Sequence, residues 1–340
     1  MRLRDFQSRL KKEGVDTCLL INLEPWKDVN VTYFSDVEAN GLLVINNHPT
    51  FFVSLLEIAD AAVRSQVKTV VLKFFDETVK QYVKGKVVGL NFDVIPLSLF
   101  YRLKKLLKVK FVDVGPWLRE LRMVKTDEEV VRLKKSAKVI STIVDAVIDK
   151  ASHTDSELAT ADRVSKLMRD AGVVASFPTI VAAGKNAASP HHIPSVAKLH
   201  GFVVLDAGVV VDGYCSDITR TFFVGRPSRK ELDIYEKVAA AQKLALDNLH
   251  VSCAAVHNRV AAVLGKDFIH ALGHGIGREV HEAPRITASS KDVFQEGMVV
   301  AIEPGCYPKT FGVRIEDMVL CTNGRPRLLS SAYHGLVIKK

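Results

Sequence analysis

The chain has 340 residues, 48% of them hydrophobic, and a net charge of +9 at neutral pH. This length exceeds that of a usual single domain and predicts two, each large enough to bury a core. No apolar run reaches the roughly 18 residues of a membrane helix, and the N-terminal stretch has the pattern of an amphipathic helix rather than a signal peptide. We therefore expect a cytoplasmic protein with no membrane partner.

The positive charge permits a nucleic-acid partner. However, the lysines are dispersed over helix-like segments and rarely alternate with aromatic residues, so we expect a basic solvated surface and no nucleic-acid partner. The five cysteines are odd in number, scattered and without Cys-x-x-Cys spacing, which argues against a disulfide framework and a cysteine-based zinc site. Free, buried thiols are the prediction.

Up to about residue 120, short β-rich runs alternate with helix-like segments, which is typical of an α/β domain. The predicted strands are Thr17–Ile21, Gly41–Ile45, Phe51–Ser54, Thr69–Leu72 and Val87–Leu90. No paired acids or histidines stand out in this part. A helix-start signal in "LRMVKTDEEV" marks a new domain, so we predict domains of residues 1–122 and 123–340.

A Ser or Thr followed three positions later by Glu, the pattern of a capping box, precedes three helix-like stretches of the second domain. The pairs are Thr126 and Glu129, Thr154 and Glu157, and Ser228 and Glu231. The predicted helices run to about Lys150, to Gly172 and to about His250, and a fourth helix stops at Gly265. The order helix, helix, strands thus occurs twice. We expect the halves to pack as one antiparallel sheet covered by helices, with a site on their shared face.

Several strand-like runs carry ionisable residues where a strand usually buries an apolar side chain. Asp206 and Asp217 lie in the first half, and a lone buried carboxylate is strongly disfavoured unless a cation lies beside it. Strand alternation places Arg314 and Glu316 on one face and Asp317 on the other. The runs of the second half contribute His274, His281, Glu303, Arg314 and Glu316.

Four carboxylates and one imidazole that converged would suit two divalent ions such as Mn²⁺, Co²⁺ or Zn²⁺. Each acid alone has an ordinary alternative as a salt-bridged residue, but five in this order favour the metal site. Three other sites are disfavoured: the glycines around His274 lack the order of a phosphate loop, His281 lacks the second histidine of a zincin motif, and Cys306 has no partner base.

Two adjacent histidines, His191 and His192, lie in the polar, turn-rich stretch "GKNAASPHHIPS". We expect His192 to be solvated surface. The histidines without motif context, His270 among them, are expected to be structural or exposed.

From about residue 123 to the end, the motifs "LDAG", "SDITRT", "GHGIG", "VHEAP", "EPG" and "RIED" occur in this order. This set resembles the pita-bread metallopeptidases, which include methionine aminopeptidase, aminopeptidase P, prolidase and creatinase. The resemblance implies a pita-bread catalytic domain with two divalent ions per subunit, Mn²⁺ or Co²⁺ first and Zn²⁺ or Fe²⁺ as alternatives. The implied ligands are Asp206, Asp217, His274, Glu303 and Glu316.

The N-terminal α/β domain narrows the resemblance, because methionine aminopeptidases normally lack one, whereas prolidases, aminopeptidases P and creatinases carry it and often dimerise through it. "SPHHIP" resembles the loop of prolidase and aminopeptidase P whose histidine after proline contacts substrate, which is His191 here. "VHEAP" implies a second active-site histidine, His281. These features imply a homodimer that hydrolyses Xaa-Pro bonds, most simply in dipeptides. The alternatives are an aminopeptidase P that acts on longer peptides and a non-catalytic peptide- or protein-binding member.

For this chemistry, Glu303 is the expected proton acceptor and donor, and His281 is expected to stabilise the oxyanion. His191 is expected to position the substrate near its proline end. Arg314 either binds a terminal carboxylate with its planar guanidinium or orients Glu316.

Overall fold

The computed structural model describes residues 2–340, and these form two compact units that divide between Leu121 and Arg122. Met1, the first residue of the predicted N-terminal helix, lies outside the described residues. Among the helices within residues 2–340, none has the length and apolar character needed to span a bilayer. All five cysteines lie in the described part, where they are buried and form no disulfide, as predicted.

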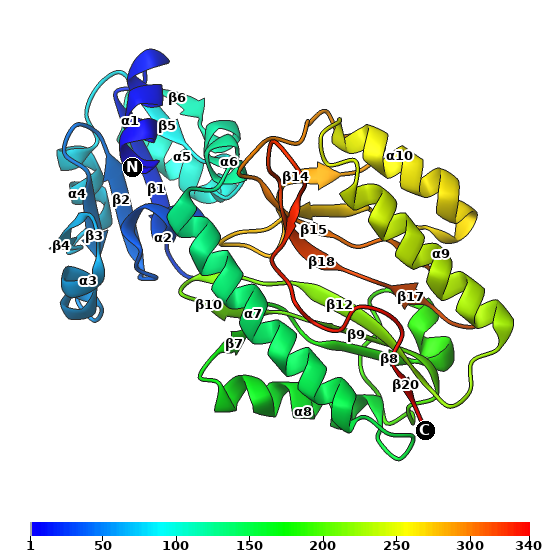
Figure 1. The fold of residues 1–340 in the computed structure, drawn as a ribbon. Helices are drawn as coiled ribbons and strands as arrows, with labels where there is room; N and C mark the ends of the chain where they lie inside the picture. The colour runs from blue at the N-terminus through cyan, green and yellow to red at the C-terminus, as the bar shows by residue number, and fades with distance from the viewer. Residues whose placement is uncertain (1) are drawn as a thin grey trace. The chain divides into compact units, whose positions relative to one another are not determined.

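The first unit is an α/β structure, as the alternation of its segments predicted (Figure 1). Its elements are α1 (Arg2–Lys12), β1 (Thr17–Asn22), α2 (Val29–Ser35), β2 (Gly41–Ile45), β3 (Thr50–Val53), α3 (Ile58–Arg64), β4 (Lys68–Val71), α4 (Phe75–Tyr82), β5 (Val87–Leu90), α5 (Leu97–Leu106) and β6 (Lys110–Asp113). Helix α6 (Gly115–Met123) crosses the division between the units.

The strands of this unit form one mixed sheet in the order β4-β3-β2-β1-β5-β6. Both faces are covered: Phe51 packs in the apolar cluster on one face and Phe52 in the cluster on the other, and both are buried. A strand buried on both faces has a continuous apolar sequence, which is why β1 to β3 were predictable. Strand β6 was not predicted, although it has the same length and burial pattern as β4, which was predicted.

The second unit shows the predicted doubled order of two helices followed by strands. The first half contains α7 (Asp127–Lys150), α8 (Glu157–Asp170), β7 (Val174–Ala175), β8 (Ile180–Ala183), the 3₁₀ helix η1 (Gly184–Ala188), β9 (Gly201–Ala207), β10 (Val209–Val211), β11 (Tyr214–Cys215) and β12 (Ile218–Val224). The second half contains α9 (Arg229–Leu246), α10 (Cys253–Leu264), η2 (Gly265–Asp267), β13 (Gly273–Gly275), β14 (Glu282–Ile286), β15 (Val299–Ile302), β16 (Gly305–Cys306), β17 (Val313–Arg314), β18 (Asp317–Leu320), β19 (Arg327–Leu328) and β20 (Ile338–Lys339).

The strands of the second unit do not form the single antiparallel sheet that the sequence predicted. They divide into a sheet ordered β20-β12-β9-β8, a sheet ordered β14-β13-β15-β18-β19, and two smaller sheets. The first sheet is not wholly antiparallel, because β20 runs parallel to β12. The two larger sheets adjoin where the Glu316 N–H donates to the Thr219 carbonyl at 3.0 Å. The predicted shared face therefore exists as a junction between two sheets.

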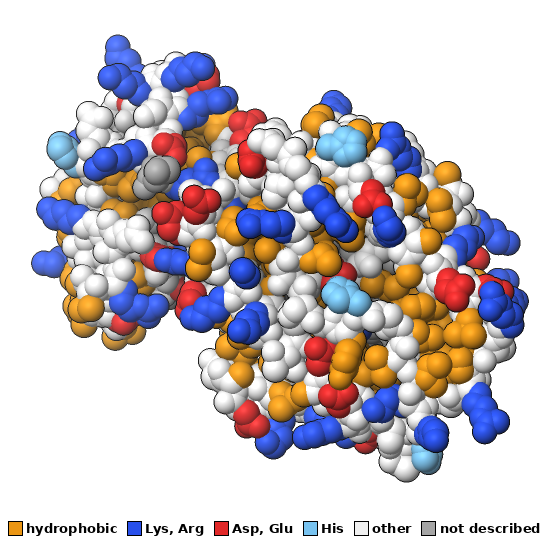
Figure 2. All heavy atoms as spheres, in the orientation of Figure 1, with side chains coloured by type: hydrophobic (Ala, Val, Ile, Leu, Met, Phe, Trp, Pro, Cys, Tyr) orange, Lys and Arg blue, Asp and Glu red, His pale blue; other side chains and the backbone are white. Residues whose placement is uncertain are grey.

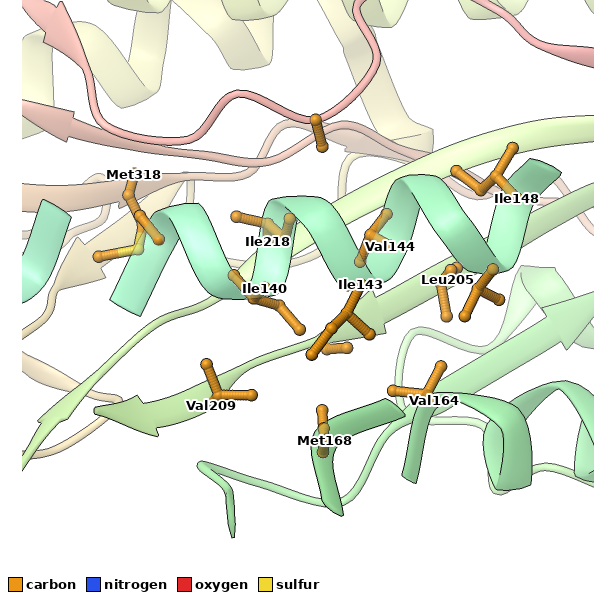
Figure 3. Packing of buried hydrophobic residues seen from close by; sticks show 14 of the residues in the cluster. Ile140, Ile143, Val144, Ile148, Val164, Met168, Leu205, Val209, Ile218 and Met318 are labelled. Carbon is orange, nitrogen blue, oxygen red and sulfur yellow. The ribbon is translucent and has the colours of Figure 1, made fainter. Parts of the chain in front are cut away.

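Each helix pair packs on the strands of its own half (Figure 1). In the first half, Ile140 and Val144 of α7 lie over β9, β10 and β12, and Val164 and Met168 of α8 join the same cluster (Figure 3). These apolar stripes recur every three to four residues, the spacing that places side chains on one helix face. The helices thereby fix the strands from which the site residues project.

Two of the three predicted capping boxes are confirmed. Thr126 and Glu129 bond reciprocally at the start of α7, and Ser228 and Glu231 do the same at the start of α9. Helix α10 ends at Leu264, as predicted, and the following glycine has a positive φ.

The third predicted box is wrong. Helix α8 is capped by Ser156, whose Oγ accepts from the Ala159 N–H at 3.1 Å. Thr154 lies further out and contacts the Ser152 hydroxyl at 2.6 Å. Glu157 is therefore the first residue of the helix rather than part of a box, and its carboxylate bonds elsewhere.

The surface carries both signs of charge. On the face shown in Figure 2, Lys and Arg side chains are scattered among acidic and apolar ones and form no continuous band.

Candidate metal centre

The five predicted ligands lie in strands or directly beside them. Asp206 lies near the end of β9, where it is paired with Thr219, and Asp217 directly precedes β12. His274 lies within β13, Glu303 directly follows β15, and Glu316 directly precedes β18. Both halves of the second unit therefore contribute ligands.

These side chains form one cluster. The His274 Nε2 lies 3.6 Å from the Asp217 Oδ2 and 3.9 Å from a Glu303 carboxylate oxygen. Three overlapping groups have ligand atoms that all lie within 4.8 Å of one another. The groups are Asp206, Asp217 and Glu316; His274, Glu303 and Glu316; and Asp217, His274 and His281.

The carboxylates of the cluster are crowded in a way that fits bound cations. Burial, followed by the charge of Glu316, raises the pKa of Asp217 well above its usual value, and burial with the charge of Asp206 does the same for Glu316. Burial raises the pKa of Glu303 to about 7, with Arg314 opposing the shift. Within residues 2–340, the buried Oδ1 atoms of Asp206 and Asp217 have no hydrogen-bond partner. Buried, unpaired and mutually repelling oxygens are a donor set that divalent cations satisfy.

His274 is held in the protonation state that a metal ligand requires. Its Nδ1 lies 3.0 Å from the Gly275 carbonyl oxygen, which only accepts, so Nδ1 carries the proton and the Nε2 lone pair faces the carboxylates. Burial also lowers the pKa of His274 to about 4, so the ring is neutral at physiological pH. The imidazole is thus ready to donate its Nε2 electron pair.

Arg314 is buried and binds the ligand residues themselves. Its Nη2 donates to the Asp206 Oδ2 at 2.6 Å. Its Nε donates to the Thr219 hydroxyl at 3.1 Å, which in turn donates to the Glu316 carboxylate at 2.8 Å. Its Nη1 donates to the Tyr307 hydroxyl at 2.8 Å. These contacts favour the ligand-orienting hypothesis over the carboxylate-binding one, because each guanidinium nitrogen already has a partner.

Arg314 and Asp317 belong to two strands, β17 and β18, rather than to the one strand predicted, but the predicted separation of their sides is found. Asp317 turns away from the cluster and accepts from the Arg220 guanidinium at 2.6 Å, while Arg314 and Glu316 reach the ligands.

The cluster opens into a cavity of about 880 Å³, a volume within the usual range of small-molecule sites. His191 and His281 are exposed and line it. The His281 ring packs edge-on against His274, with centroids 4.3 Å apart. Desolvation, followed by the charge of Arg285, lowers the pKa of His281. Both predicted active-site histidines thus line the cavity into which the cluster opens, and His281 contacts a candidate ligand.

One expectation about the other histidines is wrong, and His270 lies where no motif predicted it. The His270 ring lines the cavity, with its Nδ1 3.9 Å from the Glu303 carboxylate and its Nε2 3.0 Å from the Tyr307 hydroxyl. His192 is not simply solvated, because its side chain is only 18% exposed and its Nε2 lies 2.8 Å from the Glu157 carboxylate. The contacts of His192 with Glu157 and of His270 with Tyr307 join residues that are distant in sequence, so no local pattern predicted them.

Arg285 is a cavity residue that the sequence did not single out. It stands directly opposite His274 in the β13–β14 pairing, and directly opposed residues of antiparallel strands project to the same face. The side chain is exposed, and within residues 2–340 its guanidinium forms no hydrogen bond or ion pair. It is thus a cation in the cavity that is free to bind an anionic group.

Comparisons with known proteins agree with this geometry. Residues 131–323 match the model of metallopeptidase family M24, and residues 2–124 match the creatinase/prolidase N-terminal domain. The chain is 36% identical to the Xaa-Pro dipeptidase of Pyrococcus furiosus over 318 residues, which cover 89% of this chain and 91% of that protein.

Two solved structures are similar over nearly their whole length. The prolidase from Pyrococcus horikoshii has a TM-score of 0.91 at 32% identity, with 99% of each chain covered. The X-Pro aminopeptidase from Thermotoga maritima has a TM-score of 0.89 at 26% identity, with 97% of this chain and 99% of that one covered. The second unit therefore has the pita-bread fold, and the chain belongs to metallopeptidase family M24 with a creatinase/prolidase N-terminal domain.

Proposed function

We propose that this chain hydrolyses Xaa-Pro dipeptides at a two-metal site formed by Asp206, Asp217, His274, Glu303 and Glu316. The observation that carries the proposal is one cavity that joins this cluster to two histidines and an unpaired arginine. The names of its relatives, Xaa-Pro dipeptidase and prolidase, support the same substrate class. We further propose Mn²⁺ or Co²⁺ as the metals, with Zn²⁺ or Fe²⁺ as alternatives, and a cytoplasmic homodimer of chains divided into domains 1–122 and 123–340.

The residues around the cluster suit peptide hydrolysis. Two bound divalent ions would supply Lewis acidity and a nucleophile at neutral pH. Glu303 is the ligand to which we assign proton transfer, because its side chain is 20% exposed and lines the cavity, with its carboxylate 3.9 Å from both His270 and His274. It would accept a proton from the attacking water and pass it to the leaving proline nitrogen.

The two histidines would act on the substrate from the cavity walls. We assign His281 to the scissile carbonyl oxygen, because its ring lies against the ligand His274 and can donate a hydrogen bond as negative charge develops. His191, on the loop after Pro190, would position the substrate near its proline end.

Arg285, rather than Arg314, is the group to which we assign the substrate carboxylate. A dipeptide carries this carboxylate directly on its proline residue, close to the scissile bond. The planar guanidinium of Arg285 is unpaired within residues 2–340 and lines the cavity on the face of His274. Arginine binds carboxylates with two parallel hydrogen bonds, so this assignment predicts a preference for a free C-terminus after proline.

An aminopeptidase P that cleaves longer peptides is the second candidate. It is favoured by the structural similarity to an X-Pro aminopeptidase. The experiment that separates the two is proline release from Met-Pro against methionine release from Met-Pro-Ala, each with added Mn²⁺ or Co²⁺. Preferential cleavage of Met-Pro supports the dipeptidase, and preferential cleavage of Met-Pro-Ala assigns the aminopeptidase.

Substitution of Arg285 by methionine is expected to raise KM for Met-Pro by about 10-fold or more with little change in kcat, because a carboxylate contact is lost. The same substitution should leave cleavage of Met-Pro amide nearly unchanged, since that substrate has no carboxylate. Arg325→Met, at an exposed position outside the cavity, is the matched control. Equal losses on Met-Pro and its amide would reject the carboxylate role.

A further inference from the structure

A buried acid that is not among the proposed ligands lies next to the loop that forms one wall of the cavity. The side chain of Glu157, at the start of α8, is 0% exposed. Its Oε1 accepts from the Ala183 N–H at 2.8 Å and the Asn186 amide at 2.9 Å. Its Oε2 accepts from the His192 Nε2 at 2.8 Å, and from the Ser195 N–H at 3.0 Å and hydroxyl at 2.6 Å. Five donors therefore converge on one carboxylate.

This set of donors favours the ionised form of Glu157. Burial by itself raises the pKa of a carboxyl group, but the hydrogen bonds from Ser195, Asn186 and the other donors give Glu157 a lowered pKa. Its position in the first turn of α8 adds the favourable interaction of an anion with a helix N-terminus. A protonated Glu157 would place its own O–H against these donors, so the arrangement requires the charged carboxylate.

Three of the five donors, the His192 ring and the N–H and hydroxyl of Ser195, come from the segment that forms one wall of the cavity. We define the cavity loop as residues 189–195, of which Pro190 to Pro194 line the cavity. At one end, Arg314 donates to the Pro190 carbonyl at 3.4 Å. At the other end, the Leu158 N–H of α8 donates to the Ser195 carbonyl at 2.9 Å. His191 stands between these two anchors, and its neighbour His192 is bound to Glu157.

We propose that Glu157 is a positioning residue, whose carboxylate, through His192 and Ser195, holds the cavity loop so that His191 remains in the substrate cavity. The inference rests on the proposed function, because His191 is assigned there to substrate positioning. In this arrangement the cavity wall is preformed, because the buried charge of Glu157 determines the position of His191 on the cavity loop.

A glutamine cannot replace the carboxylate. The amide group offers one acceptor oxygen, and whichever way it is turned its nitrogen would face a backbone N–H that can only donate, that of Ala183 or that of Ser195. Glu157→Gln should therefore release the cavity loop with almost no change in side-chain volume.

In the metal-loaded enzyme, Glu157→Gln is expected to raise KM for Met-Pro by about tenfold, with a smaller change in kcat, because a displaced positioning group weakens substrate binding. The metal content should stay at the wild-type value. In the double variant with His191→Ala, the two effects should not add, since both act through His191. Ser156→Ala, which removes the cap of the same helix but none of the five donors, should lower the melting temperature and leave KM unchanged.

Hydrogen exchange separates this inference from the proposed function. Amides of residues 184–197 should exchange faster in Glu157→Gln than in the wild type, whatever substrate the enzyme cleaves. If the amides of Glu157→Gln exchange faster but the wild-type enzyme does not cleave Met-Pro, the loop anchor is retained and the proposed function is rejected. Unchanged exchange and KM, or effects that add to those of His191→Ala, would overturn the positioning role.

If Glu157→Gln does not fold, the His192 position provides the same test. His192→Ala removes a single donor and is expected to raise KM in the same direction. His192→Gln, which retains an N–H donor, should restore part of the loss. Equal KM values for the wild type and His192→Ala would likewise overturn the inference.

Discussion

Replacement of Glu303 by glutamine is expected to lower kcat for Met-Pro by at least about 100-fold while the protein keeps its fold. Glutamine has the same shape, but its amide cannot accept and return a proton. The side chain lies at the cavity, with its carboxylate 3.9 Å from both His270 and His274, so the change affects the reacting groups directly. Steady-state kinetics with saturating Mn²⁺, together with metal analysis and thermal melting, measure the effect.

The matched control is Glu296→Gln, because Glu296 is an exposed glutamate that precedes β15 and does not line the cavity. It should retain wild-type kcat. A Glu303→Gln protein with full metal content and normal turnover would contradict the assignment of proton transfer.

Substitution of Asp217 by asparagine is expected to weaken Mn²⁺ binding by at least about 100-fold, more than the loss of an outer-sphere contact usually costs. An amide is a poorer ligand and removes one negative charge from the cluster. In the metal-stripped protein the same substitution should stabilise the fold, because Asp217 is a buried carboxylate whose pKa is raised by burial and by neighbouring acids. Removing this charge should raise the melting temperature of the metal-free protein.

Calorimetric titration with Mn²⁺ tests the loss of affinity, and melting curves with and without metal test the change in stability. Asp212→Asn is the control, since Asp212 is an exposed aspartate at a positive φ that asparagine tolerates, and its carboxylate accepts from the surface Lys135. Its metal affinity should equal that of the wild type. Unaltered Mn²⁺ affinity in Asp217→Asn would show that this residue is not a ligand.

Local physics explains which features of the fold were predictable. The capping boxes at Thr126 and Ser228 involve residues three positions apart, and the buried strands of the first unit are apolar on both faces. The same local pattern failed at Thr154, because Ser156 is a competing cap and Glu157 is used by a loop more than 30 residues away. The division of the second unit's strands into two larger sheets could not be predicted either, because it depends on which distant strands pair with one another.

The same distinction applies to the site. Asp206 and Asp217 stood out because a carboxylate in an apolar strand needs a cation, whichever residues lie nearby. The role of Arg314 could not be decided from sequence, because its planar group suits a substrate carboxylate as well as Asp206, and only the fold brings that aspartate within 2.6 Å. Arg285 and His270 belong to no spaced motif and became candidates through the cavity they line.

The most direct measurement is proline release from Met-Pro by metal-stripped protein to which Mn²⁺ is added stepwise. We expect no release in the presence of a chelator and a rate that reaches its plateau at about two ions per chain, as a two-metal centre requires. Full activity in the chelated protein, or no cleavage of Met-Pro with Mn²⁺, Co²⁺, Zn²⁺ or Fe²⁺, would contradict the account.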